Sequence, residues 1–231
     1  MAVAKPVGER LCPDCGAGHL GIGCAVCGWS GEAVTMKQVT FTLSAALLGC
    51  AAIWQATDGG RAVTAEGARR VQIAENPVHV PPVLLETMDG SLQMWPAQGQ
   101  PILLEFIYTT CPTICQTSGG DFAELRDHLT DEGLDVPMYS VSFDPVADAL
   151  PELQSFGEAH GASGQPWTIA RPETDAVAGL LDLFRVTVIP DGWGGYQHNI
   201  AVLVINPNGE FAGAYDTRAF EDIRSAVEAM L

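Results

Sequence analysis

Two cysteines near the middle of the chain have the type and spacing to do chemistry. Three residues separate Cys111 from Cys115, and residues 116–129 after them have the apolar spacing of a helix. Two thiols four residues apart in the first turn of a helix lie on one face of it. The positive end of a helix also favours thiolate over thiol. Such a pair can close into a disulfide or bind a soft metal ion.

A second set of cysteines lies near the N-terminus, in two pairs that each have two residues between them. The pairs are Cys12 with Cys15 and Cys24 with Cys27. Each pair turns two thiolates toward one point, and four thiolates suit tetrahedral zinc. The segment is too short for a core of its own, so a metal would have to hold it together. We predict a zinc-ribbon-like module over residues 1–35; two disulfides or a rubredoxin-like iron site are the alternatives.

A third ligand decides between metal and redox chemistry at the first pair. Thiolates select soft ions such as Cu(I), which then takes a further ligand, typically an imidazole. Of the five histidines, His198 stands at the mouth of a strongly apolar strand, whereas His128 and His160 lie near helix ends in acidic surroundings and are expected to face solvent. In a thioredoxin-like sheet that mouth can approach the cysteine loop. We predict His198 as a copper ligand; a structural histidine is the alternative.

The charge of the chain is unevenly distributed. Acidic residues number 28 and basic residues 11, for a net charge of −17. The two signs balance up to Thr57, so the excess lies in the remainder, which has no lysine. A domain this acidic repels nucleic acid, and we exclude DNA and RNA as partners. The charge indicates a solvated surface or, alternatively, a cationic partner.

An uncharged apolar run from Val39 to Ala56 separates the two cysteine sites. It is long enough to span a membrane, and Trp54 near its end fits an interfacial anchor. We predict a transmembrane anchor over residues 38–57, with a buried core helix as one alternative. The other alternative is that translation begins at Met36, so that the run is a lipoprotein signal and Cys50 is lipidated.

Either tether places the C-terminal part outside the cytoplasm. A zinc ribbon of reduced thiols belongs in the cytoplasm. We therefore predict a single-pass protein of a bacterial-type inner membrane, with a cytoplasmic N-terminal module and a periplasmic C-terminal domain. The flanking charges do not set this orientation, because Lys37 precedes the span and Arg61, Arg69 and Arg70 follow it.

The remaining chain must position Cys111, Cys115 and His198. After a polar linker over residues 58–75, periodicity predicts strands at 83–87, 91–95, 101–108, 138–143, 167–170, 200–205 and 210–215, and helices at 113–129, 151–160, 174–184 and 219–231. Such an order gives an α/β sandwich around a mixed sheet. With cysteines at a strand-to-helix junction, residues 76–231 are predicted to be thioredoxin-like.

Several segments together resemble one known family. They are Phe106–Cys115 (FIYTTCPTIC), Val141–Pro145 (VSFDP), Pro166-Trp167, and His198 before an apolar strand that ends in Asn206–Gly209 (NPNG). This combination is similar to the SCO/SenC family from about Val83 to the C-terminus. Members are membrane-tethered, thioredoxin-like copper chaperones that help to assemble the dinuclear copper site of cytochrome c oxidase.

The resemblance implies copper ligands at Cys111, Cys115 and His198, and a supporting residue beside them at Asp144. It also implies that the partner is the copper-site subunit of cytochrome c oxidase or another copper protein. The chain departs from the family pattern at three places. Gln116 stands where members usually have proline. Of the arginine and aspartate that commonly follow the Asp-Pro motif, alanine replaces the arginine at position 147, while the aspartate is present as Asp148. The segment before His198 is rich in glycine and tryptophan. These departures leave the ligands intact and bear on the choice of partner.

Three functions compete. The first is a metallochaperone, not an enzyme, that binds copper through Cys111, Cys115 and His198 and passes it on by ligand exchange. The second is a thiol–disulfide oxidoreductase, in which Cys111 attacks and Cys115 resolves. The third is an interaction protein that acts through its N-terminal module. We favour the first, because the cysteine pair and the histidine are all present.

Overall fold

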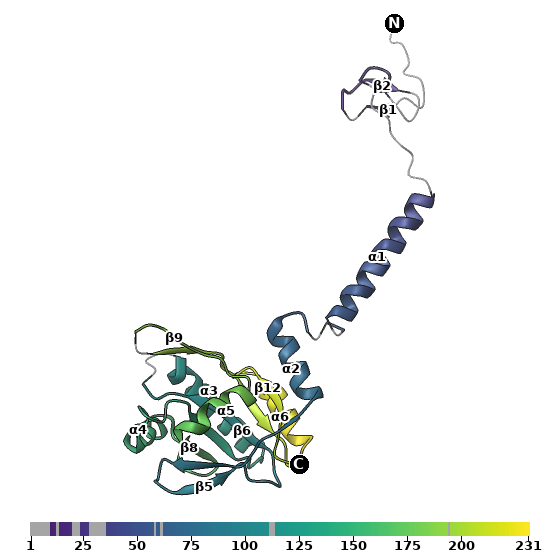
Figure 1. Cartoon of the computed structure of the whole chain (residues 1–231). Coiled ribbons are helices and arrows are strands. Elements are labelled where there is room, and N and C mark those ends of the chain that lie inside the picture. Colours follow the sequence, from purple (N-terminus) through teal and green to yellow (C-terminus); the bar gives the residue numbers. More distant parts are fainter. Residues whose placement is uncertain are drawn as a thin grey trace. The chain divides into compact units, whose positions relative to one another are not determined.

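The chain has 231 residues. The computed structural model describes residues 10–12, 14–19, 24–27, 36–57, 59–60, 62–110, 114–193 and 195–231. For Arg10, His19, Ile114, Cys115 and Gln116 it describes the backbone alone. The chain divides into two compact units, Met1–Gly60 and Arg61–Leu231, and each is described by itself (Figure 1).

The first unit contains a two-stranded antiparallel sheet and a long helix. Strand β1 (Arg10–Leu11) pairs with β2 (Gly18–His19). Helix α1 (Met36–Ala56) has 21 residues, and none of its side chains is buried. It is long and apolar enough to cross a membrane, and among the described residues it is the one helix of this kind. It overlaps the predicted anchor at 38–57, and it continues for six residues beyond Cys50.

The second unit alternates strands and helices. Its helices are α2 (Ala65–Glu75), α3 (Ile114–Asp131), α4 (Leu150–His160), α5 (Thr174–Leu183) and α6 (Phe220–Glu228). Its strands are β3 (Val78–His79), β4 (Val83–Thr87), β5 (Leu92–Trp95), β6 (Ile102–Ile107), β7 (Met138–Ser142), β8 (Trp167–Pro172), β9 (Val188–Pro190), β10 (Tyr196–His198), β11 (Val202–Ile205) and β12 (Glu210–Tyr215).

Eight of the described strands form one mixed sheet in the order β3-β12-β11-β6-β7-β8-β4-β5. The central strands β6, β7 and β8 are parallel, and the pairs outside them are antiparallel. Strand β6 is buried at all six positions, as a central strand covered on both faces should be. Because parallel strands end at one edge, the loops after β6 and β7 meet there. The predicted cysteine loop follows β6 at this edge.

Helices cover both faces of the sheet. Side chains alternate between faces along a strand, so neighbouring residues of β6 show which helix lies on each side. Glu105 accepts a hydrogen bond from Ser118 of α3, whereas the ring of Phe106 packs at 5.6 Å from Phe184, just after α5. Helix α3 also packs against α4 and α6. The unit is therefore the predicted α/β sandwich around a mixed sheet, with the thioredoxin-like arrangement of a strand, a cysteine loop and a helix.

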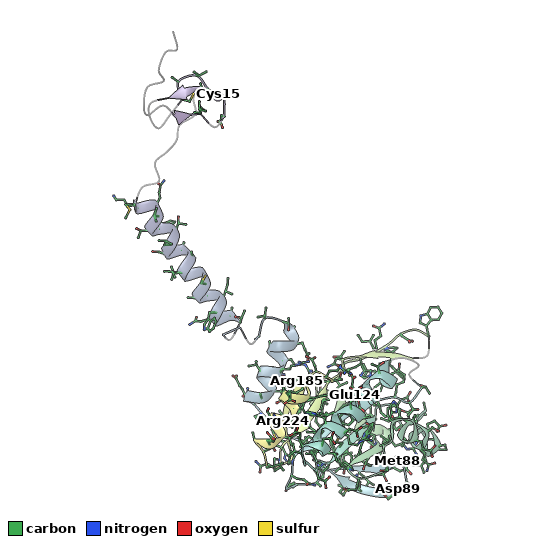
Figure 2. All side chains as sticks on the ribbon, turned by 180° about the vertical axis from the view of Figure 1, so that it is seen from behind. Cys15, Met88, Asp89, Glu124, Arg185 and Arg224 are labelled. Atoms are coloured by element: carbon green, nitrogen blue, oxygen red, sulfur yellow. The ribbon has the colours of Figure 1, made fainter. Side chains whose placement is uncertain are left out.

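Two elements were not expected from the sequence. Helix α2 lies in the segment predicted as a polar linker at 58–75 and packs against β12. An ion pair of 2.6 Å joins Arg70 of α2 to Asp216. Arg185, which is labelled in Figure 2, donates a hydrogen bond of 2.6 Å to Gln72 of α2. The second element is an antiparallel hairpin of β9 and β10, which carries His198 and stands apart from the main sheet.

Candidate metal centre

The predicted cysteine pair lies at the start of α3. Cys111 falls outside the described residues. Cys115 belongs to the first turn of α3, and its side chain is not described. The two residues before the loop are described: Thr109 and Thr110 follow the buried side chain of Tyr108. The helix thus follows strand β6 as predicted, while the positions of the two sulfurs remain a prediction.

His198 ends strand β10 and is half-buried against aromatic rings. Its ring lies edge-on to Phe143 at 5.1 Å and to Tyr108 at 6.2 Å between centroids. Its Nδ1 lies 3.3 Å from the carbonyl oxygen of Asn199. A carbonyl only accepts, so this contact places the proton on Nδ1 and the lone pair on Nε2. Burial lowers the pKa of His198, although the contact with Asn199 opposes that shift, so the neutral imidazole that binds metals is favoured.

Tyr108 holds the histidine hairpin against the strand that leads to the cysteines. Its hydroxyl donates to the carbonyl oxygen of Tyr196 at 3.0 Å and accepts from the backbone N–H of the same residue at 3.2 Å. Tyr196 is two residues before His198, and Tyr108 is three residues before Cys111. The fold therefore brings His198 to the base of the cysteine loop, which is what a shared site requires.

The predicted supporting residue, Asp144, lies after the end of β7 beside the same hairpin. Its backbone N–H donates to Ser142 Oγ at 3.0 Å. The charge of Asp144 raises the pKa of the Tyr196 hydroxyl, and burial and a hydrogen bond between the two side chains add to the shift. The structure thus brings Asp144 to the histidine hairpin.

Asp148 is a site residue that the sequence analysis did not identify. Its carboxylate is fully buried and accepts hydrogen bonds from both the backbone N–H and the hydroxyl of Thr109, at 3.1 and 2.6 Å, and from Ser142 Oγ at 2.5 Å. Arg171 donates to the carbonyl oxygens of Asp148 and Pro145, at 3.1 and 2.8 Å. Asp148 therefore ties the entry of the cysteine loop to the turn after β7. The signal in the sequence was an aspartate four residues after Asp144.

Glu105 is a second buried carboxyl group that was missed. It lies on β6 and accepts hydrogen bonds from Ser140 Oγ at 2.6 Å and from Ser118 Oγ of α3 at 2.7 Å. Burial raises the pKa of Glu105 to about 7, although the two serines oppose the shift. A single glutamate within an apolar strand was the available signal.

Two other histidines differ from their expected exposure. His128 and His160 were expected to face solvent, but both are half-buried. The ring of His160 packs at 4.3 Å from that of Phe156, and the ring of His128 packs at 5.9 Å from Phe220. The acidic residues near these two histidines in the sequence were therefore a poor guide to the exposure of their side chains.

The four N-terminal cysteines surround one point. Their sulfur atoms all lie within 4.8 Å of one another. The separation between the sulfurs is 3.5 Å for Cys12 and Cys27 and 3.6 Å for Cys15 and Cys24. Both exceed the S–S bond length of about 2.05 Å. Backbone N–H groups of Cys27 and Val26 lower the pKa of Cys24 to about 6, which favours the thiolate form that metals bind.

A tight turn at Cys15, which is labelled in Figure 2, builds one half of this cluster. Cys12 accepts a backbone hydrogen bond of 2.9 Å from Gly16 and donates one of 2.8 Å to Ala17. Gly16 has φ of +70°, which L side chains rarely adopt, so glycine suits this position. Cys12 and Cys24 are buried while Cys15 and Cys27 are exposed. The cluster has the ligand set of a structural zinc site.

The fold and the site define a thioredoxin-like protein with cysteines at a strand-to-helix junction and a histidine brought to the same edge. The model of the SCO1/SenC family matches residues 75–230, which is more than half of the chain. The chain belongs to the SCO1/SenC family.

Individual relatives agree with this assignment. An SCO1 protein homolog of Bacillus subtilis (strain 168) is 26% identical over 158 residues, which are 65% of this chain and 81% of that protein. BsSco, described as a member of the Sco family of cytochrome c oxidase assembly proteins with a disulfide switch, has a TM-score of 0.60 and 25% identity over 67% of this chain and 94% of its own. Bradyrhizobium japonicum ScoI, solved with copper bound, has a TM-score of 0.55 and 20% identity over 67% of this chain and 100% of its own.

Proposed function

We propose that the protein is a membrane-tethered copper metallochaperone that takes part in assembling the copper site of cytochrome c oxidase. Membership of the SCO1/SenC family supports this proposal, as do the copper bound to ScoI and the assembly role given for BsSco. The observation that carries it is the placement of His198. His198 is half-buried, burial lowers its pKa, and the hydroxyl of Tyr108 holds the hairpin that carries it through both backbone groups of Tyr196.

The proposed ligands are Cys111, Cys115 and His198. Two thiolates and an imidazole suit Cu(I), a soft ion. Each thiol gives up its proton when the ion binds, and the start of α3 favours that loss. Three protein ligands leave room for a ligand from the receiving protein, so the ion can pass on by ligand exchange. Asp144 supports the site from beside Tyr196.

Thiol–disulfide exchange is a second candidate function, favoured by the thioredoxin-like fold. The Cys111 thiolate would attack a target disulfide to form a mixed disulfide and release one target thiolate. The Cys115 thiolate would then attack Cys111 Sγ, which releases the second target thiolate and closes a Cys111–Cys115 disulfide. The target is reduced by two electrons and the cysteine pair is oxidised by two.

The N-terminal module is proposed to hold zinc through Cys12, Cys15, Cys24 and Cys27. The clustering of four sulfurs around one point supports this assignment. We further propose that α1 spans the membrane, with the module in the cytoplasm and the C-terminal unit in the periplasm. The length and composition of α1 support the span, and the need of a thiolate zinc site for a reducing compartment supports the orientation.

Replacing the histidine tests the copper site. The full chain, with its four N-terminal cysteines changed to serine so that they cannot bind Cu(I), is titrated against a Cu(I) chelator of known affinity. We expect one tightly bound Cu(I) per chain and an affinity at least tenfold lower in His198→Ala, because one of three ligands is lost. His79→Ala, at an exposed position of β3, is the matched control and should bind as tightly as the parent. Unchanged affinity in His198→Ala would refute the three-ligand site.

A further inference from the structure

The hairpin that carries His198 also presents the most exposed large apolar side chain among the described residues. Trp193, in the turn between β9 and β10, is 93% exposed, and Ile189 of β9 is 57% exposed. Isolated aliphatic side chains at a surface are ordinary, but a fully exposed tryptophan is a strong signal, because this residue type dominates the binding energy of protein interfaces.

Hydrogen bonds to Asp191 hold the described residues of the turn that carries Trp193. Asp191 Oδ1 accepts from the backbone N–H of Trp193 at 2.7 Å and from that of Gly195 at 3.0 Å. The N–H of Asp191 in turn donates to the carbonyl oxygen of Gly195 at 3.0 Å. An aspartate that bonds to its own turn in this way fixes the backbone. Trp193 is therefore presented at a defined place before any partner binds, which lowers the entropy cost of docking.

The two faces of the hairpin have different surroundings. Tyr196 and His198 face the rings of Tyr108 and Phe143. Gln197 lies between Tyr196 and His198 in β10, so its side chain points to the opposite face and is exposed. Ile189 of β9 is paired with Gln197. One face is thus attached to the metal site, while the other face and the turn are open. Trp193 lies beyond the last strand pair, five residues from His198, which is at most about 17 Å at about 3.4 Å per strand residue.

The charge of the unit distinguishes a protein partner from a lipid surface. Acidic residues exceed basic ones strongly in this unit, and Asp144 and Asp191 lie at the hairpin itself. The described arginines of the unit all donate hydrogen bonds within it: Arg69, Arg70, Arg126, Arg171, Arg185, Arg218 and Arg224. Such a surface repels anionic lipids and attracts a surface rich in lysine and arginine.

From these observations we infer that the β9–β10 hairpin docks the copper-receiving protein, with Trp193 inserted into an apolar pocket that is bordered by basic side chains. The inference rests on the proposed function, since it names the surface by which the same site meets its acceptor. A partner that holds Trp193 brings its own metal ligands to within reach of the ion at His198. Direct contact of the two sites is what ligand exchange requires.

Binding of the copper-free proteins tests the inference. The full chain in a nanodisc of phosphatidylcholine is immobilised, and the soluble copper-site domain of the oxidase from the same organism is the analyte. We expect Trp193→Ala to weaken binding at least tenfold, Trp193→Phe to retain most of it, and added salt to slow association of the parent. Leu92→Ala, which removes a side chain 65% exposed on the edge strand β5, is the matched control and should change nothing.

Three outcomes would overturn the inference. The first is equal binding by the parent and by Trp193→Ala, and the second is no binding by the parent. The third concerns the part of the tryptophan fluorescence that the parent has and Trp193→Phe lacks: brominated lipid in the nanodisc quenches it. The last would place Trp193 in the bilayer. Because these measurements use no copper, failure of the inference is distinguishable from failure of the proposed function, which shows itself as a parent chain that does not load Cu(I).

Discussion

The two cysteine sites of this chain differ in what holds their ligands in place. At the N-terminus, four sulfurs come from two short turns beside a two-stranded sheet. Among the described residues of that module, the buried apolar ones are Cys12 and Cys24. In the C-terminal unit the predicted cysteine ligands follow a central strand of an eight-stranded sheet with a large buried core, and His198 ends a separate hairpin that packs on the aromatic rings of this core. A closed site of four thiolates has no open position for exchange, whereas a site of two thiolates and an imidazole keeps one. The first arrangement suits a structural metal and the second a transferable one.

Metal removal should separate the two sites most strongly. Metal-binding free energies of about 10–16 kcal/mol are the folding free energy of small zinc modules. We therefore expect a zinc chelator, or Cys12→Ser, to unfold the N-terminal module and leave the C-terminal unit folded, as followed by amide hydrogen exchange on the full chain. Cys50→Ser, on α1 and outside both sites, is the control and should leave both units protected. If the amides of the metal-free N-terminal module stay protected from exchange, the module does not depend on metal and the two sites do not differ in this respect.

The C-terminal site should instead depend on buried protein groups. Asp148→Ala leaves the N–H of Thr109 and the hydroxyl of Ser142 without their buried acceptor, and we expect it to lower the free energy of unfolding by about 3 kcal/mol. Cu(I) affinity should fall with it, because the loop entry is released. Asp131→Ala, at the exposed end of α3, should change the free energy by less than about 0.5 kcal/mol. Urea unfolding measures the free energy, and competition with a chelator measures the Cu(I) affinity. Equal effects of Asp148→Ala and Asp131→Ala would refute the role of Asp148.

A smaller effect is expected from pH through Glu105. Its pKa is about 7 in the fold against an ordinary value of 4.5, so the folded state binds the proton more tightly than the unfolded chain. The stabilisation is complete below pH 4.5 and is lost as pH rises through 7. Glu105→Gln removes this loss, so its advantage over the parent should grow by about 2 kcal/mol between pH 5 and pH 8. Glu158→Gln, exposed on α4, should follow the parent at both pH values in urea titrations. A constant difference between Glu105→Gln and the parent would show that Glu105 does not titrate in this range.

Most of the sheet was predictable because its signals are local. Strand β4 was expected at 83–87 and is found there, and both hairpin signals hold: Gly90 and Gly209 have φ of +83° and +77°, as tight turns demand. The order of strands and helices fixed the thioredoxin-like fold. Helix α2 was missed because its arginines and glutamates look like a polar linker. The signal was Thr64, whose hydroxyl accepts from the N–H of Gly67 and caps the helix.

The candidate site was less predictable, because burial of a carboxylate depends on the assembled fold. His198 stood out by its place before an apolar strand, and the fold brings it to Tyr108. The partners of Asp148 and Glu105 come from other strands and helices, such as Thr109 and Ser118, and no local pattern records them. The β9–β10 hairpin was also missed, since its glycine-rich turn resembles an ordinary loop.

The hydroxyl of Tyr108 bonds to both backbone groups of Tyr196, so the hairpin is held below its turn and the sequence of the turn can vary. The position of His198 is fixed below the turn, so exposed residues of the turn such as Trp193 can change without moving the imidazole. Gly195 is the constrained member, because a Cβ there would lie 2.7 Å from Asp191 Oδ2 and 3.4 Å from the Tyr108 hydroxyl. Lineages could thus alter which acceptor is recognised while inheriting the same ligands, and an engineer could graft a new turn for the same purpose.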